Sequence, residues 1–328
     1  MKSRVLLAPR RGEVEFQEVE VGPPGPGQIQ VRMHASLVSP GTERAFITGM
    51  ENTSGTYPWE PGYCAAGTVA AVGPDVTRFK PGDRVGCLMT HRSLGNLSQE
   101  RTTLLPADVS FEQAAFLTIG LIAFQGVRKA RIELGESALV FGLGIIGQFA
   151  LQLTRLDGAF PAIGVDRVAK RMEVARQCGA DLTLDTSQPN WMDSLKQATG
   201  GTGPQVVIEA TGSPTVINDA LTAAGEFGRV VLLGSTRGIS TVNFYQLVHV
   251  KGTVVIGAHT RTAPKQESRP GYWTWDDNAR VLVRLMQSGR INTRALTTER
   301  VKAGEVLPLY RDMLAGKLDM IGTLIDWT

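Results

Sequence analysis

One glycine-rich turn constrains the fold of this chain more than any other stretch. The apolar run Ser137–Phe141 has the length of a buried strand, and Gly142, Gly144 and Gly147 follow it in the spacing G-x-G-x-x-G. The next residues, Gln148–Leu156, have the apolar periodicity of a helix. A strand, a tight glycine turn and a helix in this order predict the first half of a β-α-β unit.

Each glycine of this turn has its own reason to lack a side chain. Gly142 permits the tight turn, Gly144 lets the backbone approach a pyrophosphate, and Gly147 allows the helix to pack close to the strand. The free N–H groups and the dipole at the start of the helix favour an anion there. The predicted dinucleotide-binding residues of the turn are Gly142, Leu143, Gly144, Ile145, Ile146 and Gly147.

A carboxylate after the next predicted strand supports this interpretation over an ordinary strand–turn–helix with a surface aspartate. Asp166 follows the strand Ala162–Val165, and a carboxylate about 20 residues after the glycine turn accepts hydrogen bonds from an adenosine ribose. It would repel a 2′-phosphate, which favours NAD over NADP. Arg167, Lys170 and Arg171 keep NADP open as an alternative, because arginine here can neutralise a phosphate.

The residues around the turn predict a doubly wound parallel sheet. Six short, mostly β-branched runs alternate with helix-like stretches, which matches two βαβαβ halves. Ligands bind at the carboxyl ends of the strands in such sheets. Thr211, Gly234 and Ser235 follow the fourth and fifth runs and are therefore expected on the nicotinamide side of the site. The six runs are Ser137–Phe141, Ala162–Val165, Leu182–Leu184, Gln205–Glu209, Arg229–Leu233 and Thr253–Gly257.

The first 120 residues or so contain short strand candidates about 8–12 residues apart. This spacing predicts a compact, barrel-like β domain. Ser110 and Gln113 have the spacing of a capping box, which opens a helix. The tail from Ala295 reads as strand, helix and strand, and we expect it to rejoin the first domain. The predicted domains are residues 1–121 and residues 122–262, followed by a C-terminal segment, residues 263–328, that returns to the first domain.

Composition excludes several classes of protein. A chain of 328 residues with 42% hydrophobic content suggests about two globular domains. Lys and Arg total 34 against 31 for Asp and Glu, without a basic cluster, so we expect no nucleic-acid partner. No apolar run reaches the roughly 18 residues of a membrane span. Cys64, Cys87 and Cys178 are too widely spaced for a disulfide framework or a metal-binding pair, so we expect a cytoplasmic protein.

The motifs in this order resemble the medium-chain dehydrogenase/reductase superfamily, which includes zinc alcohol dehydrogenases and quinone oxidoreductases. The resemblance covers essentially the whole chain. It implies an α/β protein with a GroES-like β-barrel catalytic domain plus a six-stranded doubly wound parallel (Rossmann) sheet. Residues 39–44 and 57–63 further resemble a subgroup with bacteriochlorophyllide hydroxyethyl dehydrogenases and sugar or polyol dehydrogenases. The stretches that carry the family resemblance are Gly73–Val85, Ala114–Gly120, the glycine turn with Asp166, and Val250–Gly257.

The chain departs from zinc members of this family at the positions of the metal ligands. The family's first cysteine ligand corresponds to Ser39, its His-Glu pair to Tyr63 and Cys64, and its third ligand falls near Thr118. A catalytic zinc needs three ligands drawn from thiolate, imidazole and carboxylate, and only Cys64 is of that kind. The cysteines of a structural zinc lobe are also missing around Cys87. We therefore predict no metal.

Without zinc, another group must move the proton or hold charge on the substrate oxygen. A tyrosine hydroxyl can act as general acid or oxyanion donor, and a threonine hydroxyl can relay the proton. The alternative for Tyr63 is a packing role. For Ser39, Thr42 and Glu43 it is turn-stabilising hydrogen bonds, and for Glu43 also an ion pair with Arg44. For His91 it is a solvated position in a loop. The candidates are Tyr63, Thr42, Ser39, Glu43 and His91.

The sequence as a whole favours a zinc-independent oxidoreductase that transfers hydride between NAD(H) and a secondary alcohol or ketone. Aromatic and charged residues such as Trp59, Trp273 and Arg261 favour a sugar, polyol or other polar ring-bearing metabolite, unless the tryptophans only anchor their loops. The alternatives are an NADPH-dependent quinone or enoyl reductase and a nucleotide-binding protein without turnover. The last run, Thr253–Gly257, would lie at a sheet edge. Relatives pair this edge across a two-fold axis, so we expect a homodimer.

Overall fold

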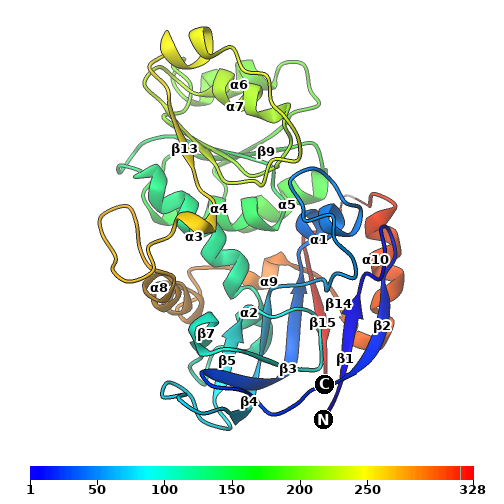
Figure 1. Cartoon of the computed structure of the whole chain (residues 1–328). Coiled ribbons are helices and arrows are strands. Elements are labelled where there is room, and N and C mark those ends of the chain that lie inside the picture. Colours follow the sequence, from blue (N-terminus) through cyan, green and yellow to red (C-terminus); the bar gives the residue numbers. More distant parts are fainter. Residues whose placement is uncertain (318) are drawn as a thin grey trace. The chain divides into compact units, whose positions relative to one another are not determined.

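The structure is a computed structural model that describes residues 1–317 and 319–328. The chain forms two compact units, one of residues 1–118 with 283–328 and one of residues 119–282 (Figure 1). Residues 263–282, which we expected in the returning tail, belong to the second unit. None of the helices in the described ranges is both long and apolar enough to cross a bilayer.

The second unit contains a six-stranded sheet in the order β10-β9-β8-β11-β12-β13. Every neighbouring pair is parallel. The chain enters in the middle at β8, and the strand order reverses between β8 and β11, so the predicted doubly wound sheet is confirmed. The strands are β8 (Ala138–Phe141), β9 (Ala162–Asp166), β10 (Leu182–Asp185), β11 (Val206–Glu209), β12 (Arg229–Leu232) and β13 (Val254–Gly257).

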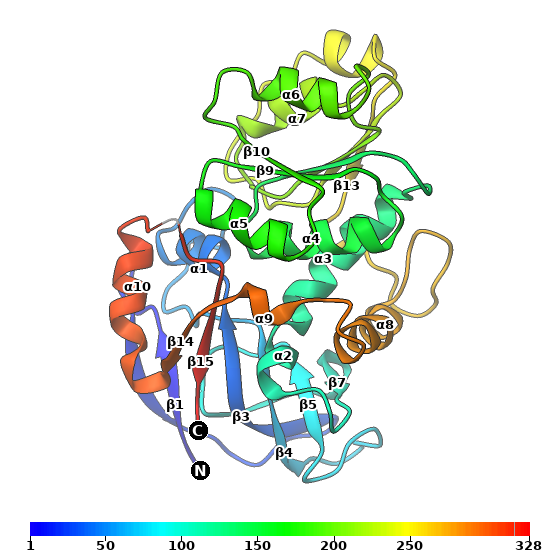
Figure 2. The same ribbon diagram turned by 180° about the vertical axis from the view of Figure 1, so that it is seen from behind.

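Helices cover both faces of this sheet. Figures 1 and 2 show α3, α4 and α5 on one face and α6 and α7 on the other. Leu139 and Phe141 of β8 pack in one cluster with Leu221 of α7, as the two-residue repeat of a strand requires. The helices are α3 (Leu117–Ala130), α4 (Ile145–Leu156), α5 (Ala169–Gln177), α6 (Trp191–Ala198), α7 (Val216–Ala223) and α8 (Trp275–Gln287), of which α3 and α8 cross the unit boundaries.

The first unit contains a sheet in the order β14-β15-β3-β4-β5-β7, with β6 also paired to β3, and a separate β1–β2 hairpin. The C-terminal strand β15 pairs antiparallel with β3, from Thr323 opposite Val38 to Asp326 opposite Ala35. The end of the tail therefore belongs to the sheet of the first unit. The strands are β1 (Lys2–Leu7), β2 (Glu15–Glu20), β3 (Gln28–Val38), β4 (Ala65–Val72), β5 (Arg84–Cys87), β6 (Leu94–Ser98), β7 (Thr102–Leu104), β14 (Thr297–Lys302) and β15 (Gly322–Asp326).

Short helices complete this unit. The predicted capping box is present, because Ser110 and Gln113 each accept the other's backbone N–H at 3.1 Å, and α2 (Phe111–Ala115) follows. Residues 40–47 form the helix α1 (Pro40–Ile47), so the segment 39–43 is not an isolated turn. The core brings α1 together with the C-terminal helix, since Ile47, Tyr310 and Ile325 belong to one buried cluster. The remaining helices are α9 (Thr293–Leu296) and α10 (Val306–Leu314).

Candidate functional site

The glycine turn lies between β8 and α4, and its glycines have different surroundings. Gly142 has φ +83°, and a Cβ there would lie 2.6 Å from Thr211 Cγ2. A Cβ on Gly147 would lie 1.7 Å from the carbonyl oxygen of Gly142, so the helix packs directly on the turn. Gly144 has ordinary φ and would meet nothing within 4 Å. The backbone at Gly144 therefore faces open space, where a ligand can approach closely.

The Asp166 carboxylate is hydrogen-bonded to this turn. Its Oδ2 accepts the Leu143 N–H at 2.7 Å, and its Oδ1 accepts the N–H groups of Arg167 at 2.8 Å and Val168 at 3.0 Å. Arg171 Nη1 lies 3.5 Å from Oδ2, whereas the Arg167 side chain is exposed. The predicted residues Leu143, Asp166 and Arg171 are thus brought together at the carboxyl end of β9.

Gln148, a residue that the sequence interpretation did not single out, braces the same region. Its buried amide Nε2 donates to the carbonyl oxygens of Leu143 at 3.1 Å and Arg171 at 2.8 Å. It therefore links the glycine turn to α5. A polar side chain on a helix that is otherwise largely apolar was the available signal.

The loops after β11 and β12 lie side by side. A Cβ on Gly212 would lie 2.6 Å from the carbonyl oxygen of Ser235, and one on Gly234 would lie 2.4 Å from Gly212 N. Of the predicted nicotinamide-side residues, Thr211 contacts the glycine turn, while Gly234 and Ser235 contact the Thr211 loop. Ile145 and Ile146 lie in the first turn of α4.

Glu209, at the end of β11, holds the first of these loops and was predicted only as a strand residue. Its Oε1 accepts the N–H groups of Thr211 at 2.6 Å and Gly212 at 3.1 Å, and also the Thr211 hydroxyl. Burial raises the pKa of the Glu209 carboxyl, although these hydrogen bonds act in the opposite direction.

In the first unit, two predicted candidates are joined directly. The Tyr63 hydroxyl donates to Ser39 Oγ at 2.8 Å. Ser39 precedes α1, yet its hydroxyl does not cap the helix. Instead, Glu43 reaches back and accepts the Ser39 N–H at 2.7 Å. The Ser39 hydroxyl is therefore available to Tyr63, whereas a serine at this position ordinarily uses its oxygen on the helix N–H groups.

The environment keeps Tyr63 protonated. Burial raises the pKa of its hydroxyl well above the ordinary value, and the charges of Cys64 and Glu43 act in the same direction. Hydrogen bonds with Ser39 and Thr42 oppose this rise. The pair Tyr63–Ser39 is thus a neutral donor pair, with Thr42 beside it in the first turn of α1.

Glu43 and His91 occupy the interior, so the alternative of a solvated position for His91 does not hold. Both side chains are fully buried, and His91 Nε2 lies 3.3 Å from Glu43 Oε1. The other Glu43 oxygen accepts the hydroxyl of Tyr310, a residue that the sequence interpretation missed. Glu43 therefore does not rely on Arg44, whose side chain is exposed.

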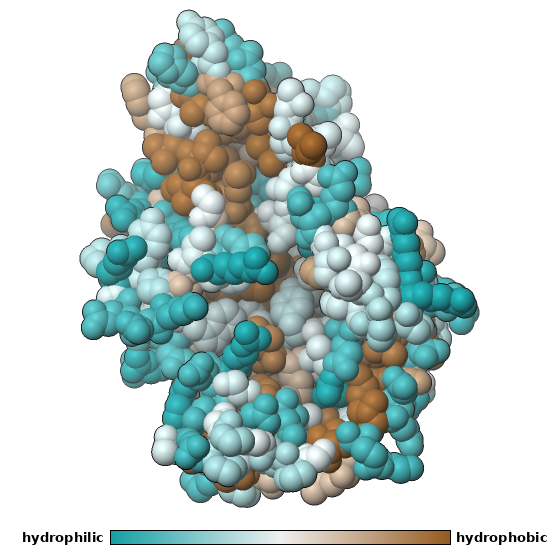
Figure 3. Space-filling model, in the orientation of Figure 1, coloured by the Kyte–Doolittle hydropathy of each residue, from teal (hydrophilic) through white to brown (hydrophobic). Residues whose placement is uncertain are grey.

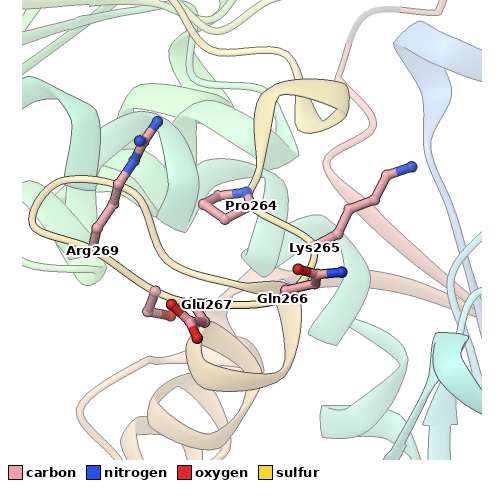
Figure 4. Close-up of a pocket in the computed structure, with 6 residues that line it drawn as sticks. Pro264, Lys265, Gln266, Glu267 and Arg269 are labelled. Carbon is pink, nitrogen blue, oxygen red and sulfur yellow. The ribbon is translucent and has the colours of Figure 1, made fainter.

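An open concavity occurs in the loop after β13, lined by residues 264–269 (Figure 4). Figure 4 shows Lys265 and Arg269 on opposite sides of the loop, with both side chains extending toward the top of the view. None of the predicted catalytic or cofactor residues lines it. Further along the loop, the Arg128 guanidinium carbon lies over the Trp273 ring, 3.7 Å from its centroid. This contact favours an anchoring role for Trp273.

Comparisons with known proteins identify the class. Residues 25–121 match the family described as alcohol dehydrogenase GroES-like domain, and residues 146–275 match zinc-binding dehydrogenase. Quinone oxidoreductase from Rattus norvegicus is 31% identical over 76% of this chain and 77% of its own length. The chain belongs to the medium-chain dehydrogenase/reductase superfamily.

Two further comparisons cover nearly the whole chain. Human sorbitol dehydrogenase is 25% identical over 93% of this chain and 91% of its own length. The crystal structure of a zinc-binding dehydrogenase from Sinorhizobium meliloti 1021, bound to NADP, shares the fold with a TM-score of 0.84 at 19% identity, covering 99% of both chains.

The residues present do not fit the zinc ion that the family description implies. Ser39 and Tyr63 hydrogen-bond to each other where zinc members carry ligands, and Thr118 is a buried residue of α3. Within residues 1–317 and 319–328, no three His, Cys, Asp or Glu side chains are grouped to hold a metal ion. Cys64 alone cannot provide a tetrahedral site.

The different surroundings of two glycines give a test of the turn. We expect Gly147→Ala to lower the stability to urea by about 1–3 kcal/mol, because the new methyl group would overlap the Gly142 carbonyl. Gly144→Ala is the matched control and should leave the urea midpoint of the second unit unchanged. Equal loss of stability in both variants would contradict this description of the turn.

Proposed function

We propose that this protein is a zinc-independent dehydrogenase that transfers hydride between NAD(H) and a secondary alcohol or ketone. The observation that carries the proposal is the Tyr63–Ser39 hydrogen bond, 2.8 Å long, at the positions of the zinc ligands in relatives. It supplies a neutral hydroxyl donor in place of a Lewis acid.

The hydroxyl pair accounts for the proton. When a ketone is reduced, negative charge grows on its oxygen, and a fixed O–H donor stabilises that charge. Because Tyr63 donates to Ser39, the hydrogen still available is that of the Ser39 hydroxyl. As Ser39 gives this proton to the substrate oxygen, Tyr63 passes its own proton to Ser39, and the Tyr63 phenolate takes a proton from solvent before the next turnover, because its raised pKa favours the protonated form. Oxidation of the alcohol follows the same path in reverse.

The second unit provides the residues for the cofactor, whose nicotinamide ring gives or accepts the hydride. The turn Gly142–Gly147 offers an open backbone approach at Gly144 and the N-terminus of α4 for a pyrophosphate. Asp166 is oriented by its backbone donors to accept ribose hydroxyls. We favour NAD because this carboxylate repels a 2′-phosphate, although the S. meliloti relative holds NADP and Arg171 lies beside Asp166.

A polyol or sugar is the proposed substrate class, supported by the similarity to sorbitol dehydrogenase over 93% of the chain. The second candidate function is reduction of a quinone or enone, which the 31% identity to a quinone oxidoreductase favours. An assay of nicotinamide absorbance separates the two candidate functions. One arm contains NAD⁺ with polyols or sugars, and the parallel arm contains NADPH with quinones or enones. Turnover only in the second arm would contradict the first proposal.

Removing the tyrosine hydroxyl tests the proton path. We expect Tyr63→Phe and Ser39→Ala each to lower kcat by about 100-fold with NADH affinity unchanged, because each breaks the same relay. The double variant should be no slower than either single one, since both residues act as a unit. If kcat of the double variant fell by the product of the two single-variant factors, a shared relay would be contradicted.

The pH dependence follows from the direction of the Tyr63 pKa. Its ordinary value is about 10, and a raised pKa keeps the donor protonated as pH rises through that value. We therefore expect the rate of ketone reduction to show no loss attributable to Tyr63 between about pH 8 and pH 10. A loss in that range that disappears in Tyr63→Phe would contradict the proposed donor state.

Substitution of Asp166 tests cofactor choice. Asp166→Ala also disturbs the turn, which affects both cofactors, so the informative quantity is the ratio of NADH to NADPH affinity. We expect this ratio to fall by about tenfold or more in fluorescence titrations, because only NADH loses hydrogen bonds to a charged acceptor. An unchanged ratio would contradict the NAD assignment.

We also propose a homodimer through β13, in a cytoplasmic protein whose three cysteines remain free. Strand β13 is last in the sheet order, so one side of its backbone lacks a strand partner among the residues described. Val254 and Val255 are 51% and 40% exposed, and Figure 3 shows apolar side chains gathered over this region. An exposed apolar edge of this kind favours pairing with a second copy.

A charged residue on the edge tests the dimer. The native protein should have twice the 35.3 kDa chain mass by light scattering, and Val254→Asp should give the monomer mass. Leu134→Asp, at an exposed leucine elsewhere in the second unit, is the control and should remain dimeric. A native protein of monomer mass would contradict the proposal.

A further inference from the structure

A buried series of hydrogen bonds connects the C-terminus of the chain to the first turn of α1. Trp327 Nε1 donates to Ser36 Oγ at 2.8 Å, and Ser36 Oγ lies 2.7 Å from His91 Nδ1. His91 Nε2 lies 3.3 Å from Glu43, whose other oxygen accepts the Tyr310 hydroxyl. These five residues are contributed by β3, α1, the β5–β6 connection, α10 and the chain end.

The directions of these hydrogen bonds can be deduced from the donors. An indole N–H can only donate, so Ser36 Oγ accepts from Trp327. Ser36 is fully buried, and His91 Nδ1 is the one side-chain acceptor that the described residues offer its hydroxyl. Ser36 therefore donates to Nδ1. The ring of His91 is then neutral, with its hydrogen on Nε2, and it donates to Glu43.

The remaining donors converge on the Glu43 carboxylate. Tyr310 has no other hydroxyl partner than Glu43 in the described ranges, and burial beside that charge raises the pKa of Tyr310, so it stays protonated. The backbone N–H of Ser39 is the third donor, at 2.7 Å. Glu43 is thus an acceptor-only, ionised carboxylate held by Tyr310, His91 and Ser39.

We propose that Tyr310 and Trp327 are positioning residues for the Tyr63–Ser39 pair, acting through Glu43 and His91. This inference rests on the proposed function and deepens it. Glu43 holds Ser39 by its backbone N–H, which leaves the Ser39 hydroxyl to Tyr63. When the carboxylate loses a donor, it can turn away from Ser39. The serine oxygen is then drawn to the open N–H groups of α1, as at an ordinary helix N-cap.

A pair of Tyr→Phe variants tests the role of Tyr310. Tyr310→Phe removes a hydroxyl from Glu43, at the start of α1. Tyr57→Phe is the matched control, because the Tyr57 hydroxyl bonds to the carbonyl oxygens of Phe46 and Ile47 at 2.9 Å, at the opposite end of the same helix. We expect kcat to fall about tenfold in Tyr310→Phe with NADH affinity unchanged, and no such fall in Tyr57→Phe.

The imidazole nitrogens of His91 give a readout that is independent of activity. In the full chain labelled with ¹⁵N-histidine, which has four histidines, we expect His91 to be protonated at Nε2 and unprotonated at Nδ1. Ser36→Ala removes the hydroxyl that donates to Nδ1, and Trp327→Phe removes the indole N–H that holds this hydroxyl in place. Each variant should therefore shift the Nδ1 resonance. Tyr310→Phe should shift the Nε2 resonance, and Tyr57→Phe should not.

The outcomes separate this inference from the proposed function. A His91 ring protonated at Nδ1, or a Tyr310→Phe variant equal to Tyr57→Phe in kcat and in the His91 spectrum, overturns the inference. If the native chain oxidises no alcohol and reduces no ketone, the proposed function fails. The effect of Tyr310→Phe on the His91 resonances, compared with that of Tyr57→Phe, then decides whether the network exists.

Discussion

The buried carboxylate of Glu43 is the constraint on which the first unit depends. A charge with no exposure to solvent is tolerated only when surrounding donors replace the lost water. Here those donors belong to His91 on the β5–β6 connection, Tyr310 on α10 and the backbone at Ser39. Satisfying this one group therefore fixes the start of α1, holds the C-terminal helix against it, and leaves the Ser39 hydroxyl to accept the Tyr63 hydroxyl.

The second unit depends on close approach of backbone rather than on a charge. No side chain fits at Gly147, because α4 lies directly on the carbonyl of Gly142. This contact brings the N-terminus of α4 to the end of β8. Asp166 of β9 accepts the Leu143 N–H there, and Gln148 of α4 links the turn to α5. The open position at Gly144 is a consequence, and it is the feature that suits a pyrophosphate.

Local patterns in the sequence were sufficient for the Rossmann sheet and the capping box at Ser110, since each depends on neighbouring residues or on strand periodicity. The sequence interpretation left residues 39–43 as a turn, although Pro40 suits the start of a helix, where proline is favoured. The burial of His91 could not be predicted, since Ser36 and Glu43 lie 55 and 48 residues away. Tyr310 lies 267 residues from Glu43, and no local pattern indicates that contact.

The central claim is that a hydroxyl pair replaces the metal of zinc members at the substrate oxygen. This replacement is tested most directly by measuring the zinc content of an active preparation and assaying the same preparation with and without a chelator. We expect far less than one zinc per chain and full activity in the presence of the chelator. About one zinc per chain, with activity lost to the chelator and restored by added zinc, would contradict it.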